Sequence, residues 1–250
     1  MRRADVPWGA IDAVFLDAGH TILCWDYAFA AELLGDVGLS ARAERLVRAE
    51  AAARPEWSRF LAGGTSSEST AGRAAYVTRL VAAAADDFEQ RPAAEQARVV
   101  SALLRALRTP EAQDRLWSVV PSGLPAMLER LRAAGLRLVV VSNSDGTVEA
   151  KLARAGIARH FDAIVDSHLV GAEKPDVRIF EHALARSGAA RERTLHVGDL
   201  YHVDVAGARA AGLHAALLDP FDDWRDVDCA RAPDVVALAR ELLAARGGSQ

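Results

Sequence analysis

The sequence predicts an α/β fold, in which helices cover both faces of a parallel, doubly wound, Rossmann-like sheet. Two observations support this prediction. Short apolar runs rich in Val, Leu, Ile and Phe recur along the chain and end at polar residues or glycine, as buried parallel strands do. Segments with the period of an amphipathic helix separate the later runs, so strand and helix alternate. The expected strands are residues 11–17, 136–142, 163–166, 194–198 and 214–218.

The helices between the later strands have recognisable ends. A glycine follows each helical segment, where a left-handed C-terminal cap is easiest for a residue without a side chain. The expected helices are Leu124–Ala134, Thr147–Ala155, Val177–Ser187 and Val203–Ala211, followed by Gly135, Gly156, Gly188 and Gly212.

A long stretch after the first expected strand breaks this alternation. Residues 24–117 contain no convincing strand and are rich in Ala, Leu, Arg and Glu, which predicts several helices. We therefore expect an α/β core domain formed by residues 1–23 and 118–250, with a helical cap domain formed by residues 24–117. A cap over the carboxyl ends of the strands would exclude water from a reacting centre.

Composition restricts the classes of function. The 250 residues carry a net charge of −4, and acids and bases are spread along the chain, so no basic stripe is available for nucleic acid. The two cysteines, Cys24 and Cys229, make neither a disulfide framework nor a metal cluster and suit a reducing compartment. No apolar stretch approaches the length of about 18 residues that a membrane span needs, and residues 1–8 lack the pattern of a signal peptide. We expect a soluble, cytoplasmic monomer or homodimer that binds neither nucleic acid nor membrane.

Polar residues finish the expected strands. In an open parallel sheet, ligands bind outside the carboxyl ends of the strands. The first strand ends at Asp17, the second at Ser142 and Asn143, and the fourth at Asp199, while the third leads to Lys174. Only two of the 30 basic residues are lysines, which makes this lysine conspicuous. We expect all these side chains to lie on one edge of the sheet.

Four segments at these strand ends form an ordered set of motifs: Phe15–Thr21, Val140–Asn143, Glu173–Asp176 and Val197–Asp204. Together they resemble the motifs of the haloacid dehalogenase superfamily, in the branch whose helical cap is inserted after the first motif. The resemblance implies a five-stranded core sheet with the strand order 3-2-1-4-5. It also implies that Asp17 attacks phosphorus to form an aspartyl-phosphate, which water then hydrolyses.

The resemblance implies a role for each residue around this nucleophile. Phosphoryl transfer depends mostly on positioning and on neutralising the charge of the phosphoryl oxygens. Lys174 is expected to neutralise phosphate and to hold Asp17 ionised. Ser142, Asn143 and Thr21 are expected to bind phosphoryl oxygens. The expected substrate is a small phosphorylated molecule.

The same resemblance implies a magnesium site. The expected ligands are the carboxylates of Asp17 and Asp199 and the main-chain carbonyl of Gly19, because Mg²⁺ prefers oxygen ligands and keeps several waters. Asp204 is expected either to bind the metal directly or to orient metal-bound water. As an alternative, this residue could serve as the N-terminal cap of the following helix.

Gly19 departs from the family pattern, because phosphatases of this type carry a second Asp there as general acid and base. Such catalysis contributes about 10² to 10⁴-fold to the rate. One hypothesis is a phosphatase that acts on leaving groups of low pKa or borrows an acid such as His20. A second is a dehalogenase-like hydrolase, because a leaving halide needs no acid, although Asp199 and Asp204 argue against it. A third is a pseudoenzyme that binds phosphate ligands or a partner without turnover.

Two further expectations concern the cap. Phosphonate cleavage in this superfamily requires a cap lysine, and residues 24–117 contain none, so we set that reaction aside. Candidate substrate contacts are Arg54, Trp57, Arg59, Arg73 and Tyr76, although such residues on helices usually pack or cover a solvated face.

Overall fold

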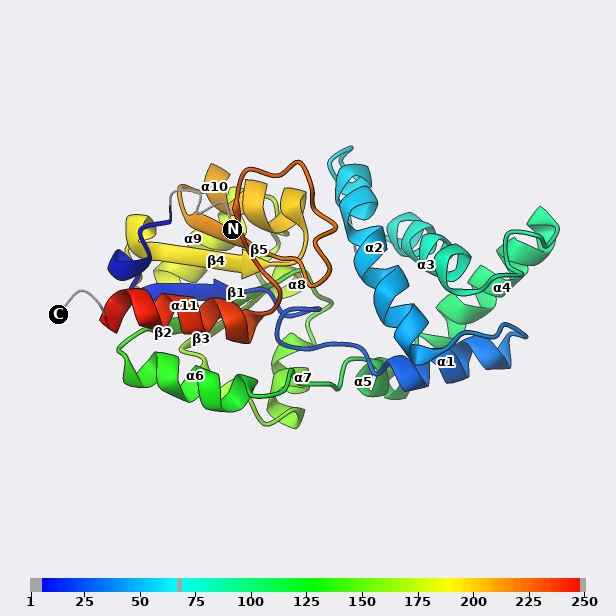
Figure 1. Cartoon of the computed structure of the whole chain (residues 1–250), viewed down its shortest axis with the longest axis horizontal. Helices are drawn as coiled ribbons and strands as arrows, with labels where there is room; N and C mark the ends of the chain where they lie inside the picture. Colours follow the sequence, from blue (N-terminus) through cyan, green and yellow to red (C-terminus); the bar gives the residue numbers. More distant parts are fainter. Residues whose placement is uncertain (1–5, 67–68, 248–250) are drawn as a thin grey trace. The chain divides into compact units, whose positions relative to one another are not determined.

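The computed structural model describes residues 6–66 and 69–247, and its chain divides into two compact units. One unit is formed by Met1–Leu23 and Val120–Gln250, and the other by Cys24–Val119. The division expected from the sequence falls after residues 23 and 117, and the structure divides after residues 23 and 119. Figure 1 shows that the first unit holds the sheet and that the second is built from helices.

The first unit contains a six-stranded parallel sheet with the order β3-β2-β1-β4-β5-β6. The predicted order of the first five strands is confirmed, and a sixth strand pairs with β5. That strand spans only the residues Ala-Arg-Ala and lacks the apolar run by which the other strands are recognised. The strands are β1 (Ala13–Leu16), β2 (Arg137–Ser142), β3 (Ala163–Asp166), β4 (Thr194–Gly198), β5 (His214–Leu218) and β6 (Ala230–Ala232).

Helices cover both faces of this sheet, because alternate strand residues point to opposite sides. Val14 and Leu16 of β1 pack in one buried cluster with α6, α7 and α11, whereas Ala13 and Phe15 pack in another with α9 and α10. The sheet is therefore doubly wound, as predicted. The helices are α6 (Leu124–Ala133), α7 (Val148–Arg154), α8 (Ser167–Val170), α9 (Val177–Ser187), α10 (Gly207–Ala210) and α11 (Val235–Gly247); short 3₁₀ turns lie at Trp8–Ala10, Ala158–His160 and Arg191–Arg193.

The predicted helix ends agree with the backbone. The four glycines expected after the helices all have positive φ, between 62° and 79°. The predicted helix Val203–Ala211 differs at its start, because residues Tyr201–Ala206 form a π-helical turn before α10. Such turns occur mostly as single, wide turns and frequently at functional sites.

The second unit is a bundle of short helices around its own core. Its helices are α1 (Tyr27–Asp36), α2 (Ala43–Leu61), α3 (Thr70–Ala84), α4 (Ala93–Ala106) and α5 (Pro110–Leu116). A cluster of buried side chains that includes Trp25, Leu46, Val81 and Phe88 joins them. Where the chain enters and leaves this unit, Cys24 and Val119 form an isolated antiparallel bridge. In the described part of the unit, this bridge is the nearest feature to a strand.

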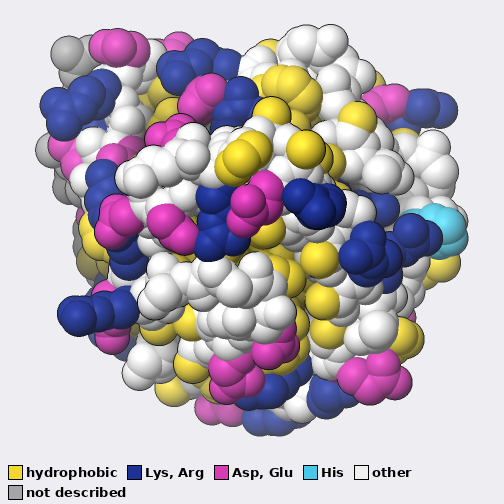
Figure 2. Space-filling model, turned by 90° about the vertical axis from the view of Figure 1, so that its right-hand side faces the viewer, with side chains coloured by type: hydrophobic (Ala, Val, Ile, Leu, Met, Phe, Trp, Pro, Cys, Tyr) yellow, Lys and Arg dark blue, Asp and Glu magenta, His cyan; other side chains and the backbone are white. Residues whose placement is uncertain are grey.

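The distribution of surface charge and the lengths of the helices bear on whether the protein binds nucleic acid or a membrane. On the face shown in Figure 2, basic and acidic side chains are interspersed rather than gathered by sign. Across residues 6–66 and 69–247, no helix combines the length and the apolar character needed to span a bilayer. Within the described residues, neither Cys24 nor Cys229 forms a disulfide.

Candidate active site

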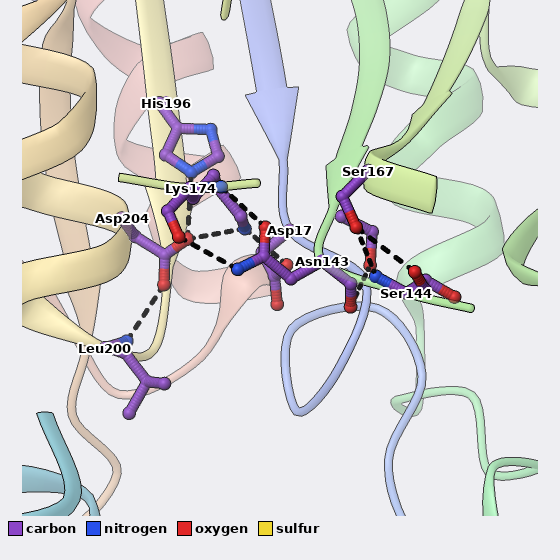
Figure 3. A network of polar contacts seen from close by, with 9 residues as sticks. Asp17, Asn143, Ser144, Ser167, Lys174, His196, Leu200 and Asp204 are labelled. Atoms are coloured by element: carbon purple, nitrogen blue, oxygen red, sulfur yellow. Dashed lines mark hydrogen bonds and ion pairs between the residues drawn. The ribbon is translucent and has the colours of Figure 1, made fainter. Parts of the chain in front are cut away.

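A buried lysine connects two of the predicted carboxylates. The Nζ atom of Lys174 donates to Oδ1 of Asp17 at 2.5 Å and to Oδ1 of Asp204 at 2.7 Å. Asp17 directly follows β1, Lys174 lies in the loop before α9, and Asp204 lies in the π-helical turn after β4 (Figure 3). Each residue is at most 8% exposed. The structure thus brings three predicted site residues together, and one ammonium group serves two carboxylates.

Asp204 has further donors. Its Oδ1 lies 3.1 Å from Nε2 of His196, and its Oδ2 accepts a hydrogen bond from the main-chain N–H of Leu200 at 3.0 Å. Gly198 makes room for this carboxylate, since a Cβ atom there would lie 2.1 Å from Cγ of Asp204. Because both oxygens of Asp204 already have protein partners, its expected role as a direct metal ligand stays a prediction.

The pKa values of Asp17 and Asp204 are shifted in opposite directions. Burial raises the pKa of Asp17 to about 6, because the nearby charge of Asp204 adds to the desolvation and Lys174 only partly offsets both. Burial also opposes ionisation of Asp204, but the charge of Lys174 and the hydrogen bond with His196 outweigh it, so the pKa of Asp204 is lowered. The two carboxylates together outweigh the burial of Lys174 and raise the pKa of its ammonium group. Lys174 therefore stays charged, and both carboxylates stabilise its charge.

The first motif folds into a tight loop after β1. The N–H of Asp17 donates to the carbonyl of Val197 at 2.9 Å, which continues the pairing of β1 with β4. The carbonyl of Ala18 then accepts from the N–H of Leu23 at 2.9 Å, and the N–H of His20 donates to the carbonyl of Leu23 at 2.7 Å. His20 is half-buried and takes a left-handed φ of 52°, which is uncommon for a residue with a side chain.

Thr21 stands out within this loop. Thr21 is only 1% exposed, and within the described parts of the chain its Oγ1 atom has no hydrogen-bond partner. Buried polar atoms in native proteins normally have a partner. This hydroxyl is therefore a candidate contact for a bound ligand.

The residues after β2 hold the rim of the sheet together. The side chain of Asn143 makes two hydrogen bonds with the main chain of Lys174 (Figure 3): its Oδ1 accepts from the N–H at 2.7 Å, and its Nδ2 donates to the carbonyl at 2.9 Å. The N–H of Ser144 donates to Oγ of Ser167 at 3.0 Å, which ties the end of β2 to the residue after β3. Ser142 is buried, and its Oγ lies 3.4 Å from the carbonyl of Asn143, which is a weak contact.

Asp199 follows β4 and is 6% exposed, so a further carboxylate, besides Asp17 and Asp204, is buried at this end of the sheet. In the described residues, no three His, Cys, Asp or Glu side chains form a group that could hold a metal ion. By their chemistry, the predicted donors would suit Mg²⁺, because the Asp17 and Asp199 carboxylates and the Gly19 carbonyl are an all-oxygen set that leaves positions for water. A cation beside Asp17 would also offset the burial that raises its pKa.

The sequence did not identify every member of the site. His196 lies within the buried run of β4, and a histidine among Leu and Val residues is the only signal that could have drawn attention to it. In the helical unit, Trp57 is buried, and the side chains of Arg54 and Tyr76 donate hydrogen bonds to the buried Glu50, whereas Arg59 and Arg73 are exposed.

Comparison with known proteins identifies the family. Residues 11–212 match the family model of the haloacid dehalogenase-like hydrolases. The chain is 40% identical over 109 residues to haloacid dehalogenase-like hydrolase domain-containing protein 3 of Mus musculus. It is 44% identical over 90 residues to a glyceraldehyde 3-phosphate phosphatase of Methanothermobacter thermautotrophicus, and 38% identical over 122 residues to a phosphoserine phosphatase of Thermus thermophilus. These matches cover 42%, 36% and 48% of this chain, and 43%, 40% and 48% of the relatives, so each spans less than half of its relative.

Solved structures share the fold. A haloacid dehalogenase-type hydrolase of Bacillus subtilis bound to magnesium superposes with a TM-score of 0.65 at 18% identity, covering 93% of this chain and 99% of that chain. A phosphatase of this superfamily from Thermococcus onnurineus gives a TM-score of 0.57 at 22% identity, covering 94% and 99%. The family match over most of the chain, the sheet order and the four motifs agree, and the protein therefore belongs to the haloacid dehalogenase-like hydrolases.

Proposed function

We propose that the protein is a Mg²⁺-dependent phosphatase that forms an aspartyl-phosphate on Asp17. The observation that carries the proposal is the contact between Lys174 and Asp17, buried at the carboxyl end of β1 beside a second, lysine-bound carboxylate. A carboxylate nucleophile with an adjacent fixed cation suits attack on an anionic phosphoryl group. The names of two relatives, which are phosphatases, support the same class of reaction.

In the first step, a carboxylate oxygen of Asp17 forms a bond to phosphorus. The bond between phosphorus and the leaving oxygen breaks, and its electron pair goes to that oxygen, which takes up a proton. Lys174 neutralises the phosphoryl oxygens, and the Thr21 hydroxyl, Ser142 and the main-chain N–H of Asn143 bind them. Fixed donors of this kind are preorganised for the charge that develops in the transition state.

In the second step, water attacks the phosphorus of the aspartyl-phosphate. The bond between phosphorus and the Asp17 oxygen breaks, which restores the carboxylate and releases inorganic phosphate. Mg²⁺, held by Asp17, Asp199 and the Gly19 carbonyl, would supply positive charge at the phosphoryl oxygens. Asp204 would hold Lys174 in place, a role that its two short contacts support more directly than metal binding.

Gly19 limits the substrates. Without a carboxyl group there, the leaving oxygen depends on another acid, for which His20 is the nearest titratable candidate, or leaves without one. We therefore expect good turnover of acyl and aryl phosphates and poor turnover of alkyl phosphates. The helical unit Cys24–Val119 would act as the cap that selects the substrate and excludes water.

A dehalogenase-like reaction is the second candidate, and Gly19 is the observation that favours it, because a departing halide needs no proton. Asp17 would then attack the carbon that bears the halogen, and the carbon–halogen bond would break with release of halide. Water would hydrolyse the resulting ester. Chloride release from a 2-chloro acid, independent of Mg²⁺, would support this reaction over phosphate transfer.

Steady-state turnover of acetyl phosphate and p-nitrophenyl phosphate, with Mg²⁺ or with EDTA, tests the proposal. We expect metal-dependent phosphate release that falls by about 10³-fold or more in Asp17→Asn. Asp86→Asn is the matched control, because Asp86 is an exposed residue of the helical unit, and we expect it to retain full activity. Tight phosphate binding without turnover would contradict the proposal and indicate a binding protein.

A further inference from the structure

The chain contains one asparagine, Asn143, and its side chain holds the main chain of one of the two lysines. The N–H of Lys174 donates to Oδ1 of Asn143 at 2.7 Å, and Nδ2 of Asn143 donates to the carbonyl of Lys174 at 2.9 Å. The orientation of the amide is fixed by this pair, because a reversed amide would set donor against donor and acceptor against acceptor. Figure 3 shows both bonds beside the contact between Lys174 and Asp17.

The two partners differ in how the fold supports them. Asn143 comes directly after β2, a strand that is paired on both sides within the sheet. Lys174 lies 31 residues later, in the loop between α8 and α9, where no strand pairing fixes the backbone. The Asn143 amide therefore attaches the loop to the sheet at the residue whose side chain enters the site.

The position of this attachment matters because of the length of the lysine side chain. Four flexible methylene groups separate the Lys174 backbone from Nζ, which nonetheless lies 2.5 Å from one carboxylate and 2.7 Å from another. Removing the attachment at the backbone would let Nζ move relative to Asp17. Displacements of about 1 Å in a catalytic group cost up to about 10²-fold in rate.

We propose that Asn143 is a positioning residue, which acts through the main chain of Lys174 to hold its ammonium group between Asp17 and Asp204. It does so in addition to any contact that its own N–H makes with phosphate. The consequence for the rate rests on the proposed phosphatase activity, whereas the placement of Lys174 does not.

Asn143→Ala removes both hydrogen bonds, and Asn143→Asp keeps the acceptor but loses the donor. Thr147→Ala, an exposed position in the same loop, is the control that leaves Lys174 untouched. The composition makes nuclear magnetic resonance decisive, since ¹⁵N-labelled lysine gives only two Nζ signals, of which Lys151 serves as the internal reference.

In the wild type, we expect the Lys174 ammonium protons to exchange slowly. In Asn143→Ala, the exchange is expected to accelerate about 10-fold and kcat to fall about 10-fold with KM little changed. Asn143→Asp is expected to accelerate the exchange at least as much as Asn143→Ala, because it sets a carboxylate oxygen against the Lys174 carbonyl, and it also serves if Asn143→Ala does not fold. Thr147→Ala and the Lys151 signal are expected to stay unchanged.

A Lys174 signal with wild-type exchange in both Asn143 variants would overturn the proposal. A fall in kcat without any change at Lys174 would also overturn it, because Asn143 would then act directly on phosphate. If the wild type has no phosphatase activity but the Lys174 signal still responds to Asn143→Ala, the positioning role holds and only the proposed function fails.

Discussion

Two buried polar networks, one in each unit, differ in their balance of charge. In the helical unit, the Glu50 carboxylate accepts from Arg54 at 2.9 and 2.6 Å, from Tyr76 at 2.9 Å and from Tyr27 at 3.2 Å. One anion thus meets one cation and two neutral donors. Burial, together with the charge of Glu50, raises the pKa of both tyrosines, so the phenols stay protonated and continue to donate.

In the sheet unit, by contrast, the single ammonium group of Lys174 serves both Asp17 and Asp204. The contacts among these described residues link α1, α2 and α3 and pair one anion with one cation, as expected of a network that stabilises a fold. The network at the sheet edge has an excess of negative charge, because two carboxylates share one ammonium group; burial and the charge of Asp204 together raise the pKa of Asp17. Charge imbalance at a buried site indicates a function that a cation or a substrate completes.

The largest effect is expected from Lys174→Met, which leaves two buried carboxylates without their cation. We expect the free energy of unfolding to fall by about 3–5 kcal/mol and turnover to reach background. Urea unfolding measures the first quantity, and Lys151→Met, which changes the other lysine, is the control.

The loss in Lys174→Met should also depend on pH. A buried carboxyl group with a raised pKa is tolerated while it is protonated, and the stability is lost as the pH rises through that pKa. The unfolding free energy of the variant should therefore fall further below that of the wild type at about pH 8 than at about pH 5. An equal loss at both values would contradict the charge imbalance.

Glu50→Gln tests the balanced network. We expect a loss of about 3 kcal/mol in the free energy of unfolding, because the buried Arg54 guanidinium loses the carboxylate to which it donates. The double variant Glu50→Met with Arg54→Met should recover much of that loss, since it removes both charges. If the double variant is as unstable as the single one, the network contributes more than charge compensation.

Gly19→Asp tests the missing acid. We expect turnover of an alkyl phosphate to rise by about 10²-fold, and that of p-nitrophenyl phosphate to rise much less. No gain in a folded variant that still binds Mg²⁺ would mean that another defect limits the reaction.

The sequence predicts most of the site residues whose positions are set by the ends of the strands. The strand ends at Asp17, Ser142 and Asp199 follow from apolar runs, and parallel strands necessarily bring their carboxyl ends to one edge. The bond from Asn143 to Lys174 could not be predicted in this way, because it depends on the path of the loop between α8 and α9. β6 also lacks a signal, since it is three residues long and is defined by its pairing with β5.

In the helical unit, the sequence predicts even less about which side chains contact one another. Arg54 and Tyr76 are predicted as candidate substrate contacts, and the structure pairs both with Glu50, a residue that the sequence does not single out. Which polar side chains meet inside a bundle depends on how the helices are rotated and spaced, and residues of three helices meet at Glu50. The period of a single helix does not contain that information.

The central claim is that Asp17 becomes phosphorylated, and chemical trapping tests it most directly. The protein is mixed with acetyl phosphate and Mg²⁺, quenched in acid and reduced with borohydride, which converts an aspartyl-phosphate to homoserine. Because Gly19 provides no base for the hydrolytic water, we expect the intermediate to accumulate and peptide mapping to find homoserine at position 17. Phosphate release at full rate with an unmodified Asp17 would contradict the account.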